Sequence, residues 1–397
     1  METRKLYYED CHRNTFTARV ESCTWQDGGY AVTLDATAFY PEGGGQAWDL
    51  GTLGGAQVLS VTERDGRILH LCSKELKVGQ TVEGRIDYPR RFGLMQQHTG
   101  EHILSGILHR RLGCHNVGFH MGAELVTVDF DTPISPEVLE QAELEANRAV
   151  WQNLPVLCSV PSPEALAHTV YRSKRALPWP VRLVEIPGID CCACCGVHVA
   201  HTGEVGLIKV FSCVRFHQGV RIEMACGGRA LGLLSRVYEQ NRQVSQVFSA
   251  KPLETGEAAR RASDLLAQEK LRAAGLRRQL NAGIADHYAN RENAAHFAPD
   301  LEPGQVRELA DAIGERVSGI AAVFSGSDGQ GYHVCLICRS GDVRPFGTAM
   351  AKALCGRGGG KPGAFQGRIC ATRSEIEAFL QKSWQEPTIL SAKNQRF

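Results

Sequence analysis

Short apolar stretches separated by turn residues run through residues 1–90. Two of them, residues 31–34 and 57–61, have the length of a strand, and Gly, Asp and Pro residues lie between such stretches. Apolar runs of this length between turn signals predict β-strands, and several in succession predict a small barrel. We therefore expect a small β-barrel over residues 1–90.

From residue 91 on, the sequence follows the spacing of a helix. Positions that recur every three or four residues fall on one face of a helix. Here they are Leu94, His98, Glu101, His102, Ser105 and Leu108. Gly113 can end this helix, because glycine readily adopts the left-handed conformation at a helix C-terminus. We predict a helix over residues 91–112 and mixed strands and helices over residues 117–230, which indicates the α+β class.

Leu, Ala, Arg, Glu and Gln dominate residues 231–295, with a break near Lys251 and Pro252. This composition predicts a long amphipathic helix or coiled-coil arm over residues 255–290. After residue 300 we expect a helix from about Pro303, strands near residues 321–325 and 333–338, a glycine-rich loop, and a final helix near residues 374–382. The chain then divides into four domains: residues 1–90, 91–232, 233–298 and 299–397.

The composition is that of an ordinary globular chain. Of 397 residues, 43% are hydrophobic and 22% are charged, and the formal net charge is +1, so no overall basic charge points to a nucleic acid. The first residues lack an apolar signal segment, and no apolar run is long enough to span a bilayer. We expect a cytoplasmic protein without a membrane partner, whose 15 cysteines are mostly reduced.

Two pairs of metal-binding residue types stand out along the chain. His98 and His102 are four residues apart, so a helix places both imidazoles on one face. Further along, Cys194 and His198 repeat this spacing. Each pair is a weak signal alone, but thiolate and imidazole are zinc ligands, and together the pairs supply the four that a zinc site takes. We predict that these four residues bind one Zn²⁺ ion.

Other thiols and imidazoles compete for these roles. Cys191, Cys192 and Cys195 surround Cys194, and each of them could replace it as the sulfur ligand. His201 is a weaker spare, which we interpret as a surface histidine at the start of a helix.

The first pair also allows a different class of enzyme. His98, Glu101 and His102 form the His-x-x-Glu-His pattern of inverted zinc peptidases, in which the glutamate is the general base. Such peptidases take a carboxylate as their third ligand, whereas a thiolate and an imidazole follow here, which disfavours a peptidase. Glu101 stays a candidate catalytic residue because it lies close to the predicted metal ligands.

Four ordered motifs resemble the editing domain of alanyl-tRNA synthetases and the free-standing AlaX proteins. They are a glycine-rich motif at residues 34–46, a first zinc motif at 90–102, a second at 194–198, and a segment at 202–209 that continues at 219–223. Residues 355–367 are similar to the glycine-rich loop of the DHHA1 domain, which long AlaX proteins also carry. The resemblance implies a β-barrel subdomain, a zinc-binding editing domain, a helical arm and an α/β DHHA1-like domain.

The resemblance also implies an activity. It indicates a zinc-dependent hydrolase that deacylates mischarged tRNA(Ala) in trans, with Ser-tRNA(Ala) and then Gly-tRNA(Ala) as substrates. It implies that Thr37 recognises the seryl hydroxyl, that Gln46 shapes the pocket, and that His120, where the synthetases carry Gln, contacts substrate. A zinc-stabilised tRNA-binding protein without catalysis is the alternative. No aminoacylation domain is expected, because the barrel begins at the first residues.

The candidate contacts to the tRNA body lie near the C-terminus. A glycine-rich loop exposes backbone N–H groups, and basic side chains beside them can form a phosphate cradle. The residues concerned are Arg357, Gly358, Gly359, Gly360 and Lys361. A purely structural turn is the alternative interpretation. The helical arm favours a homodimer, although a hairpin within one chain would satisfy the same pattern.

Overall fold

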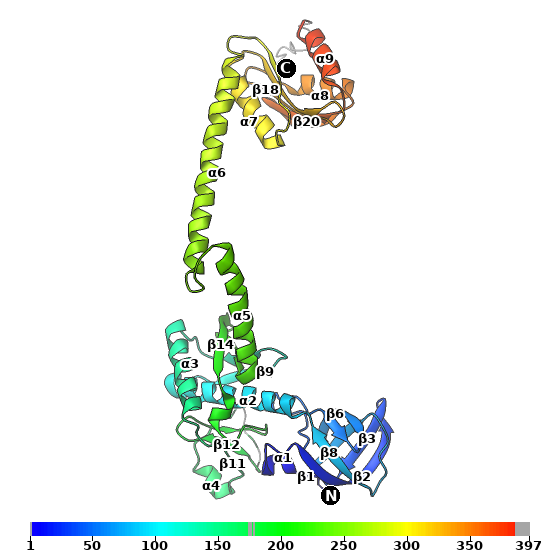
Figure 1. Cartoon of the computed structure of the whole chain (residues 1–397), viewed down its shortest axis with the longest axis vertical. Helices are drawn as coiled ribbons and strands as arrows, with labels where there is room; N and C mark the ends of the chain where they lie inside the picture. The colour runs from blue at the N-terminus through cyan, green and yellow to red at the C-terminus, as the bar shows by residue number, and fades with distance from the viewer. Residues whose placement is uncertain (1, 174–176, 178, 386–397) are drawn as a thin grey trace, which may run out of the picture. The chain divides into compact units, whose positions relative to one another are not determined.

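The structure, a computed structural model, describes residues 2–173, 177 and 179–385. Helices and mostly antiparallel sheets form an α+β architecture in this part of the chain, as the sequence predicts (Figure 1). The chain forms two compact units, Met1–Val244 and Ser245–Phe397. None of the described helices is both long enough and apolar enough to cross a membrane.

Six antiparallel strands close into a barrel near the start of the N-terminal unit, in the segment for which the sequence predicts one. In barrel order they are β2 (Thr15–Gln26), β3 (Gly29–Leu34), β7 (Arg67–Cys72), β6 (Ala56–Arg64), β5 (Gly51–Leu53) and β8 (Thr81–Ile86). Alternate residues of β8 are buried, as expected where one face of a strand points into a barrel. A parallel pair, β1 (Arg4–Lys5) and β4 (Ala36–Thr37), and helix α1 (Leu6–Glu9) complete this region.

Helix α2 (Tyr88–Leu112) follows the barrel. The Asp87 side chain caps its first turn by accepting a hydrogen bond from the Arg90 N–H at 3.3 Å, and Pro89 lies in that turn, where no N–H is required. Gly113 ends the helix at a φ of 67°, which confirms the predicted glycine cap. Because most of its central turns are buried, α2 is the element on which the helices and sheets that follow it in this unit pack.

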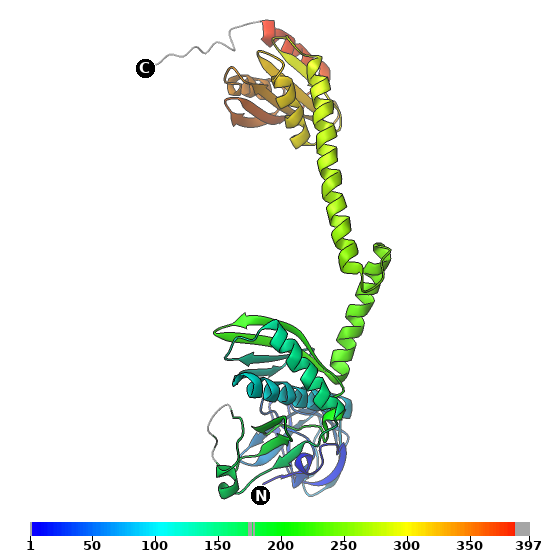
Figure 2. The same ribbon diagram turned by 90° about the vertical axis from the view of Figure 1, so that its left-hand side faces the viewer.

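A four-stranded antiparallel sheet packs on α2 and on α3 (Pro136–Trp151). Its order is β14 (Ile208–Phe216), β15 (Gly219–Cys226), β10 (Val126–Phe130) and β9 (Asn116–Met121). Both helices lie against this sheet (Figure 2), and the shared core includes Leu104, Leu108, Ile222 and Met224. This packing fixes the rotation of α2 about its axis, and therefore the direction of its polar side chains.

A smaller antiparallel sheet brings a distant segment to α2. It contains β11 (Leu157–Ser159), β12 (Leu183–Ile186) and β13 (Asp190–Ala193). Helix α4 (Pro163–Ala167) precedes β12, and a 3₁₀-helix (Thr202–Val205) follows β13. Strand β13 contacts α2, and the chain leaves it directly into Cys194. The second predicted pair of metal ligands is thereby delivered to the helix that carries the first.

Two long helices occupy the segment predicted as an arm. They are α5 (Gly227–Val247) and α6 (Thr255–Asp286), and the break between them falls at the predicted Lys251 and Pro252. Helix α6 carries several leucines with most of their surface exposed within the described chain: Leu265, Leu266, Leu271, Leu276 and Leu280. The predicted long helix is confirmed, and it ends at Asp286 rather than at residue 290.

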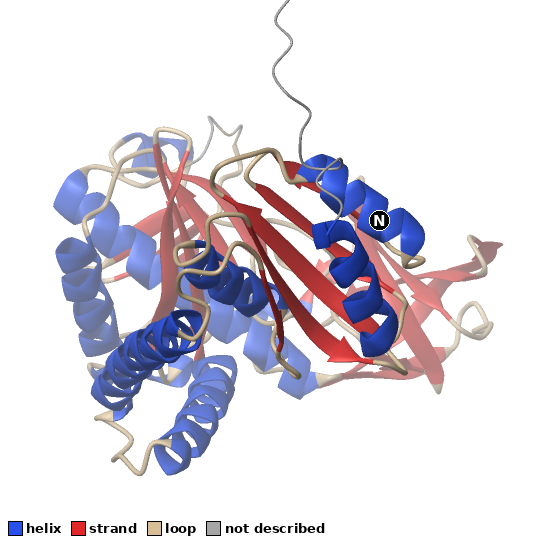
Figure 3. Cartoon of the chain, turned by 90° about the horizontal axis from the view of Figure 1, so that it is seen from above, coloured by secondary structure: helices blue, strands red, loops and turns tan. Residues whose placement is uncertain are grey.

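The C-terminal unit is built on one five-stranded sheet. Its order is β16 (Ala294–Phe297), β17 (Ile320–Ser327), β18 (Gly331–Cys338), β20 (Ala364–Ile369) and β19 (Arg357–Lys361). Helix α7 (Pro303–Gly314) packs on one face with Ala321 and Val323, and helices α8 (Arg344–Ala353) and α9 (Arg373–Gln385) pack on the other with Ala322 and Phe324 (Figure 3). The predicted helices and strands of this region are confirmed.

The prediction of a glycine-rich loop in this unit is wrong. Its residues form strand β19 at the edge of the sheet, paired with β20 across the short turn at Pro362 and Gly363. A Cβ on Gly358 or Gly360 would come within 2.5 Å or 2.0 Å of a carbonyl oxygen of β20. The glycines are therefore required by close strand pairing, which a count of turn-forming residues cannot distinguish from a loop.

Candidate metal centre and adjoining cavity

The four predicted metal ligands lie together in the N-terminal unit. One ligand atom from each of His98, His102, Cys194 and His198 can be chosen so that all lie within 4.8 Å of one another. The Cys194 Sγ is 3.4 Å from Nε2 of His98 and 3.5 Å from Nε2 of His198. The three imidazoles are almost fully buried. Four soft or borderline donors at this separation form the type of cluster that binds a transition metal.

A hydrogen bond to Nδ1 orients each imidazole of the cluster. The partner atoms are Gln46 Oε1 for His98 at 2.9 Å, Asp190 Oδ2 for His102 at 3.1 Å, and Thr99 Oγ1 for His198 at 3.2 Å. Because Gln46 Oε1 and Asp190 can only accept, Nδ1 of His98 and of His102 carries the proton. Nε2 of these two rings therefore faces the cluster, where it can donate to the Cys194 sulfur when protonated and bind a metal ion when it has lost that proton.

The Cys194 sulfur lies in a setting that favours the thiolate. Burial alone raises the pKa of the Cys194 thiol, but the charge of His98 and hydrogen bonds from the three imidazoles lower it well below its usual range. The Gly196 N–H also donates to this sulfur at 3.3 Å. A deprotonated sulfur is the form that binds metals.

Asp190 connects the cluster to Arg172, an arginine that is partly buried. Arg172 donates to both carboxylate oxygens of Asp190, at 2.6 and 2.8 Å. Burial raises the pKa of Asp190, but hydrogen bonds from His102 and Arg172 outweigh it and lower the pKa to about 2. Asp190 therefore stays ionised and holds the His102 ring in place.

The structure separates Cys194 from its neighbouring thiols. Cys195 points toward the turn formed by Gly43, Gly44 and Gly45, which we call the glycine-rich turn. Its Sγ would lie 3.2 Å from a Cβ placed on Gly44. Cys192 lies in a second group with His102 and Asp190, and Cys191 belongs to neither group. Of the four thiols, Cys194 is the one grouped with all three histidines.

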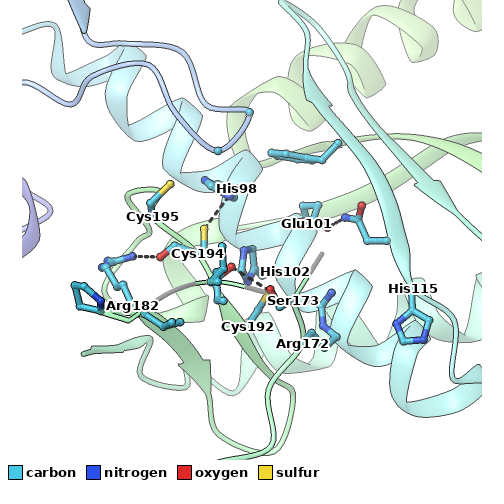
Figure 4. Close-up of a pocket in the computed structure, with 18 residues that line it drawn as sticks. His98, Glu101, His102, His115, Arg172, Ser173, Arg182, Cys192, Cys194 and Cys195 are labelled. Atoms are coloured by element: carbon cyan, nitrogen blue, oxygen red, sulfur yellow. Dashed lines mark hydrogen bonds between the residues drawn. The ribbon is translucent and has the colours of Figure 1, made fainter. Parts of the chain in front are cut away.

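A cavity of about 730 Å³ opens against the cluster. Its wall includes His98, His102 and Cys194, with Gly44 and Gly45 from the glycine-rich turn (Figure 4). The same helix and the cysteine cluster add further lining residues, and two other segments, at residues 115–119 and 172–182, supply the rest: Glu101, His115, Asn116, Phe119, Arg172, Ser173, Leu177, Pro180, Val181, Arg182, Cys192, Ala193 and Cys195. A cavity with mostly apolar walls and a few directed polar groups is typical of a small-molecule or chain-end binding site.

Glu101 lies in the wall of this cavity, as its position next to His102 predicts. Its Oε1 accepts hydrogen bonds from Ser105 at 2.5 Å and from Asn116 Nδ2 at 2.6 Å. The Asn116 Oδ1 atom is buried and has no partner within the described chain. Glu101 is thus held by two donors beside the metal cluster (Figure 4).

The structure brings Gln46 to the cluster but does not bring Thr37 or His120 there. The Gln46 carbonyl accepts from His98 and from the Val197 N–H at 3.2 Å. Thr37 is buried in the barrel, where its hydroxyl bonds to His70 Nε2 at 2.9 Å and accepts from the Phe39 N–H.

Strand alternation explains the position of His120. In β9, Phe119 lines the cavity and stacks on His98 with ring centroids 5.3 Å apart. The next side chain along a strand points to the opposite face, and His120 is exposed and absent from the cavity wall. The other candidates also have defined places. His201 caps the 3₁₀-helix at Thr202–Val205, as interpreted from the sequence, and Arg357 and Lys361 lie exposed on β19 in the C-terminal unit.

Sequence reasoning missed the residues that support the ligands. Asp190 directly precedes the cysteine cluster, so a carboxylate at that place was a usable signal. Thr99 gave none, because its partner His198 is 99 positions away. Arg172 gave none either, because nothing in the sequence indicates that it pairs with Asp190, 18 positions further along.

Two family models match parts of the chain. Residues 4–90 match the model described as tRNA synthetases class II (A), and residues 181–223 match the threonyl and alanyl tRNA synthetase second additional domain. The second match contains the Cys194 and His198 pair. The two matched segments thus include the glycine-rich turn and the cysteine cluster, which meet at the cavity.

Several curated proteins are similar over most of the chain. The alanyl-tRNA editing protein Aarsd1 of Danio rerio is 26% identical over 94% of this chain and 96% of its own length. The editing protein AlaX-L of Pyrococcus horikoshii is 32% identical over 59% of this chain and 60% of its own.

The alanine–tRNA ligase of Thermofilum pendens is 32% identical over 96% of this chain, which spans only 43% of that ligase. The solved structure of the C-Ala domain from the Aquifex aeolicus alanyl-tRNA synthetase is 19% identical, with a TM-score of 0.23. The match covers 26% of this chain and 95% of the chain of that structure. By the matched models and these relatives, the chain resembles the AlaX-type alanyl-tRNA editing proteins and the alanine–tRNA ligases.

Proposed function

We propose that this chain is a zinc-dependent hydrolase that removes the wrong amino acid from tRNA(Ala) in trans. Its main substrate is Ser-tRNA(Ala), and Gly-tRNA(Ala) is a second one. The observation that carries this proposal is the cluster of three histidines and Cys194 in the wall of a cavity. The editing proteins among the relatives support the reaction class.

The residues of the cluster fit a zinc ion. His98, His102, Cys194 and His198 would hold it, because their donor atoms converge and the imidazoles are oriented from behind. A Cβ on Gly196 would lie 2.1 Å from the His98 ring, so the loop can approach the cluster closely only with glycine there. A bound Zn²⁺ ion supplies positive charge that can polarise an ester carbonyl or lower the pKa of water.

The chain's own residues would orient the ester and its proton acceptor. Glu101 is a carboxylate held by Ser105 and Asn116 in the cavity wall, and we propose it as the acceptor of a proton from water. Gln46 is proposed as a positioning residue that acts through His98. Phe119 and Leu177 exclude bulk water from one side of the cavity.

We also propose roles for the remaining parts. The four-domain division of residues 1–90, 91–232, 233–298 and 299–397 assigns the last part to a DHHA1-like domain. Its exposed edge strand, with Arg357 and Lys361 at the two ends, would contact the tRNA backbone, since an unpaired strand edge presents N–H groups. The exposed leucines of α6 support a homodimer.

A deacylation assay tests the proposed reaction. Zinc-loaded protein is expected to release serine from Ser-tRNA(Ala) much faster than alanine from Ala-tRNA(Ala), and a chelator is expected to stop the release. Equal rates on both esters, or no release from either, would contradict the proposal. Adding Zn²⁺ back to the chelated protein should restore the rate, which controls for damage by the chelator.

A tRNA-binding protein without catalysis is the second candidate. The observation that favours it is that the chain supplies all four donors, as closed structural zinc sites do. This alternative predicts that Ser-tRNA(Ala) binds but keeps its ester, and that metal removal lowers thermal stability rather than a rate. Following binding and ester content in the same samples separates the two candidates.

Replacing Asp190 by Asn is expected to weaken zinc affinity. Asn keeps the size of the side chain but loses the charge that orients His102, and such changes behind a metal ligand lower affinity about 10–100-fold. Competition with a chromophoric chelator measures the affinity. Asp264→Asn, an exposed carboxylate on α6, is the matched control. An affinity unchanged in Asp190→Asn would show that this carboxylate does not support the metal site.

A further inference from the structure

We propose that Arg182 binds the phosphate group of the 3′-terminal nucleotide of the tRNA at the wall of this cavity. The inference rests on the proposed function, because it names the part of the substrate that the cavity holds beside the ester. It is carried by the hydrogen bonds, the stacking and the charge of Arg182.

One side of the Arg182 guanidinium is occupied and the other is available. Its Nη1 donates to the backbone oxygen of Cys194 at 2.8 Å (Figure 4) and to that of Gly196 at 3.0 Å. These two bonds use both Nη1 hydrogens. A guanidinium has five N–H donors, so the edge formed by Nε and Nη2 is left, and no hydrogen bond from it is made within the described chain. That edge matches two oxygens of a phosphate.

Stacking holds the guanidinium in a fixed orientation. Its central carbon lies 4.3 Å from the centroid of the Tyr8 ring. The Tyr8 hydroxyl donates to the Cys195 oxygen at 2.7 Å, so Arg182 and Tyr8 together bind three successive carbonyl groups. An arginine fixed in this way loses little conformational freedom when it binds an anion.

The charge of Arg182 is not neutralised within the described chain. Arg172, in the same wall, pairs with Asp190, whereas Arg182 makes no salt bridge with any described carboxylate. The undescribed residues between 173 and 179 include no Asp or Glu. A half-buried cation beside an apolar space strongly favours an anion as ligand.

The chemistry of the substrate leaves one anion near the ester. In an aminoacyl-tRNA the carboxyl group of the amino acid is esterified and uncharged. The nearest negative group is the phosphate on the 5′ side of the terminal adenosine. A cavity that holds the ester at the metal cluster must therefore place this phosphate against its wall, where Arg182 supplies the one unpaired guanidinium among the described lining residues.

Binding of small ligands to the zinc-loaded full chain tests the inference without any hydrolysis. Adenosine 5′-monophosphate is expected to bind about tenfold or more tightly than adenosine, because a charge-assisted hydrogen bond contributes about 1.5–3 kcal/mol. Calorimetric titration measures both. Inorganic phosphate is a third ligand, and binding of it as tight as that of the nucleotide would show a general anion site and overturn the assignment to the terminal nucleotide.

Two variants connect the effect to Arg182. Arg182→Gln is expected to remove the preference for the nucleotide over adenosine, and Arg182→Lys to keep part of it. Arg64→Gln, an exposed arginine on β6, is the matched control and should keep all of it. Zinc content and melting temperature show whether the loop at Cys194 is intact in each variant. A preference that survives in an intact Arg182→Gln, or none in the unaltered protein, overturns the inference.

The two proposals fail in different ways. If Ser-tRNA(Ala) is not hydrolysed but the nucleotide still binds through Arg182, the proposed reaction is wrong and the phosphate site stands. If the ester is hydrolysed and the nucleotide binds no better than adenosine, the reaction stands and the role of Arg182 is refuted.

Discussion

Replacing His102 by Ala is expected to remove the bound zinc and to reduce Ser-tRNA(Ala) deacylation to background. His102 belongs to the four-donor cluster, and it is also the member that Asp190 and Arg172 orient. Loss of one donor from a four-ligand site leaves a poorly held ion. A metal ion contributes several kcal/mol to such a reaction, so the rate is expected to fall about a thousandfold or more.

Metal analysis and the deacylation assay on the same preparation measure both effects. His120→Ala is the matched control, because this histidine is exposed on β9 outside the cavity wall, and it should keep metal and rate. Full zinc retention in His102→Ala would refute the ligand set. A metal-free variant that still deacylates would instead show that the zinc is structural.

Local signals explain why much of the fold could be predicted. The apolar spacing from Leu94 to Leu108 and the glycine at residue 113 define α2 within the sequence of α2 itself. The same spacing places His98 and His102 on one face, because helical geometry fixes which residues are neighbours. The break at Pro252 and the strands of the C-terminal sheet are local in the same sense.

The parts that could not be predicted depend on contacts between distant segments. Thr99 reaches His198, and His102 reaches Asp190, only after the segment around β13 has packed on α2. Thr37 shows the opposite case: a hydroxyl that the family resemblance assigns to the substrate finds a partner, His70, inside the barrel. Burial lowers the pKa of His70 to about 4, so this imidazole stays neutral and accepts the hydroxyl.

One long-range contact ties the barrel to the metal cluster. Arg91 on α2 and Asp49 from the barrel region form an ion pair in which both side chains are 1% exposed. Asp49 also accepts from the Tyr40 N–H at 2.6 Å, and Arg91 donates to the Ala38 oxygen at 2.7 Å. The pair therefore fixes the start of the glycine-rich turn that leads to Gln46, the partner of His98.

Replacing Asp49 by Ala is expected to lower the free energy of unfolding of the N-terminal unit by about 3–5 kcal/mol. The cost arises because Arg91 would remain as a buried charge without a partner. Chemical denaturation measures it, and Glu124→Gln, which removes the partner of Arg236 in an exposed pair, is the matched control with an expected change below about 1 kcal/mol.

A double variant separates the charge from the contacts. Asp49→Leu with Arg91→Met removes both charges and is expected to recover much of the stability, since replacing a buried pair by apolar residues is often neutral. The zinc affinity of the double variant should still be lower than that of the unaltered protein, because the turn that positions Gln46 no longer has its ion pair with α2. Normal stability in Asp49→Ala would show that the pair does not hold the barrel to the helix. Reduced stability with unchanged zinc affinity would confine its role to folding.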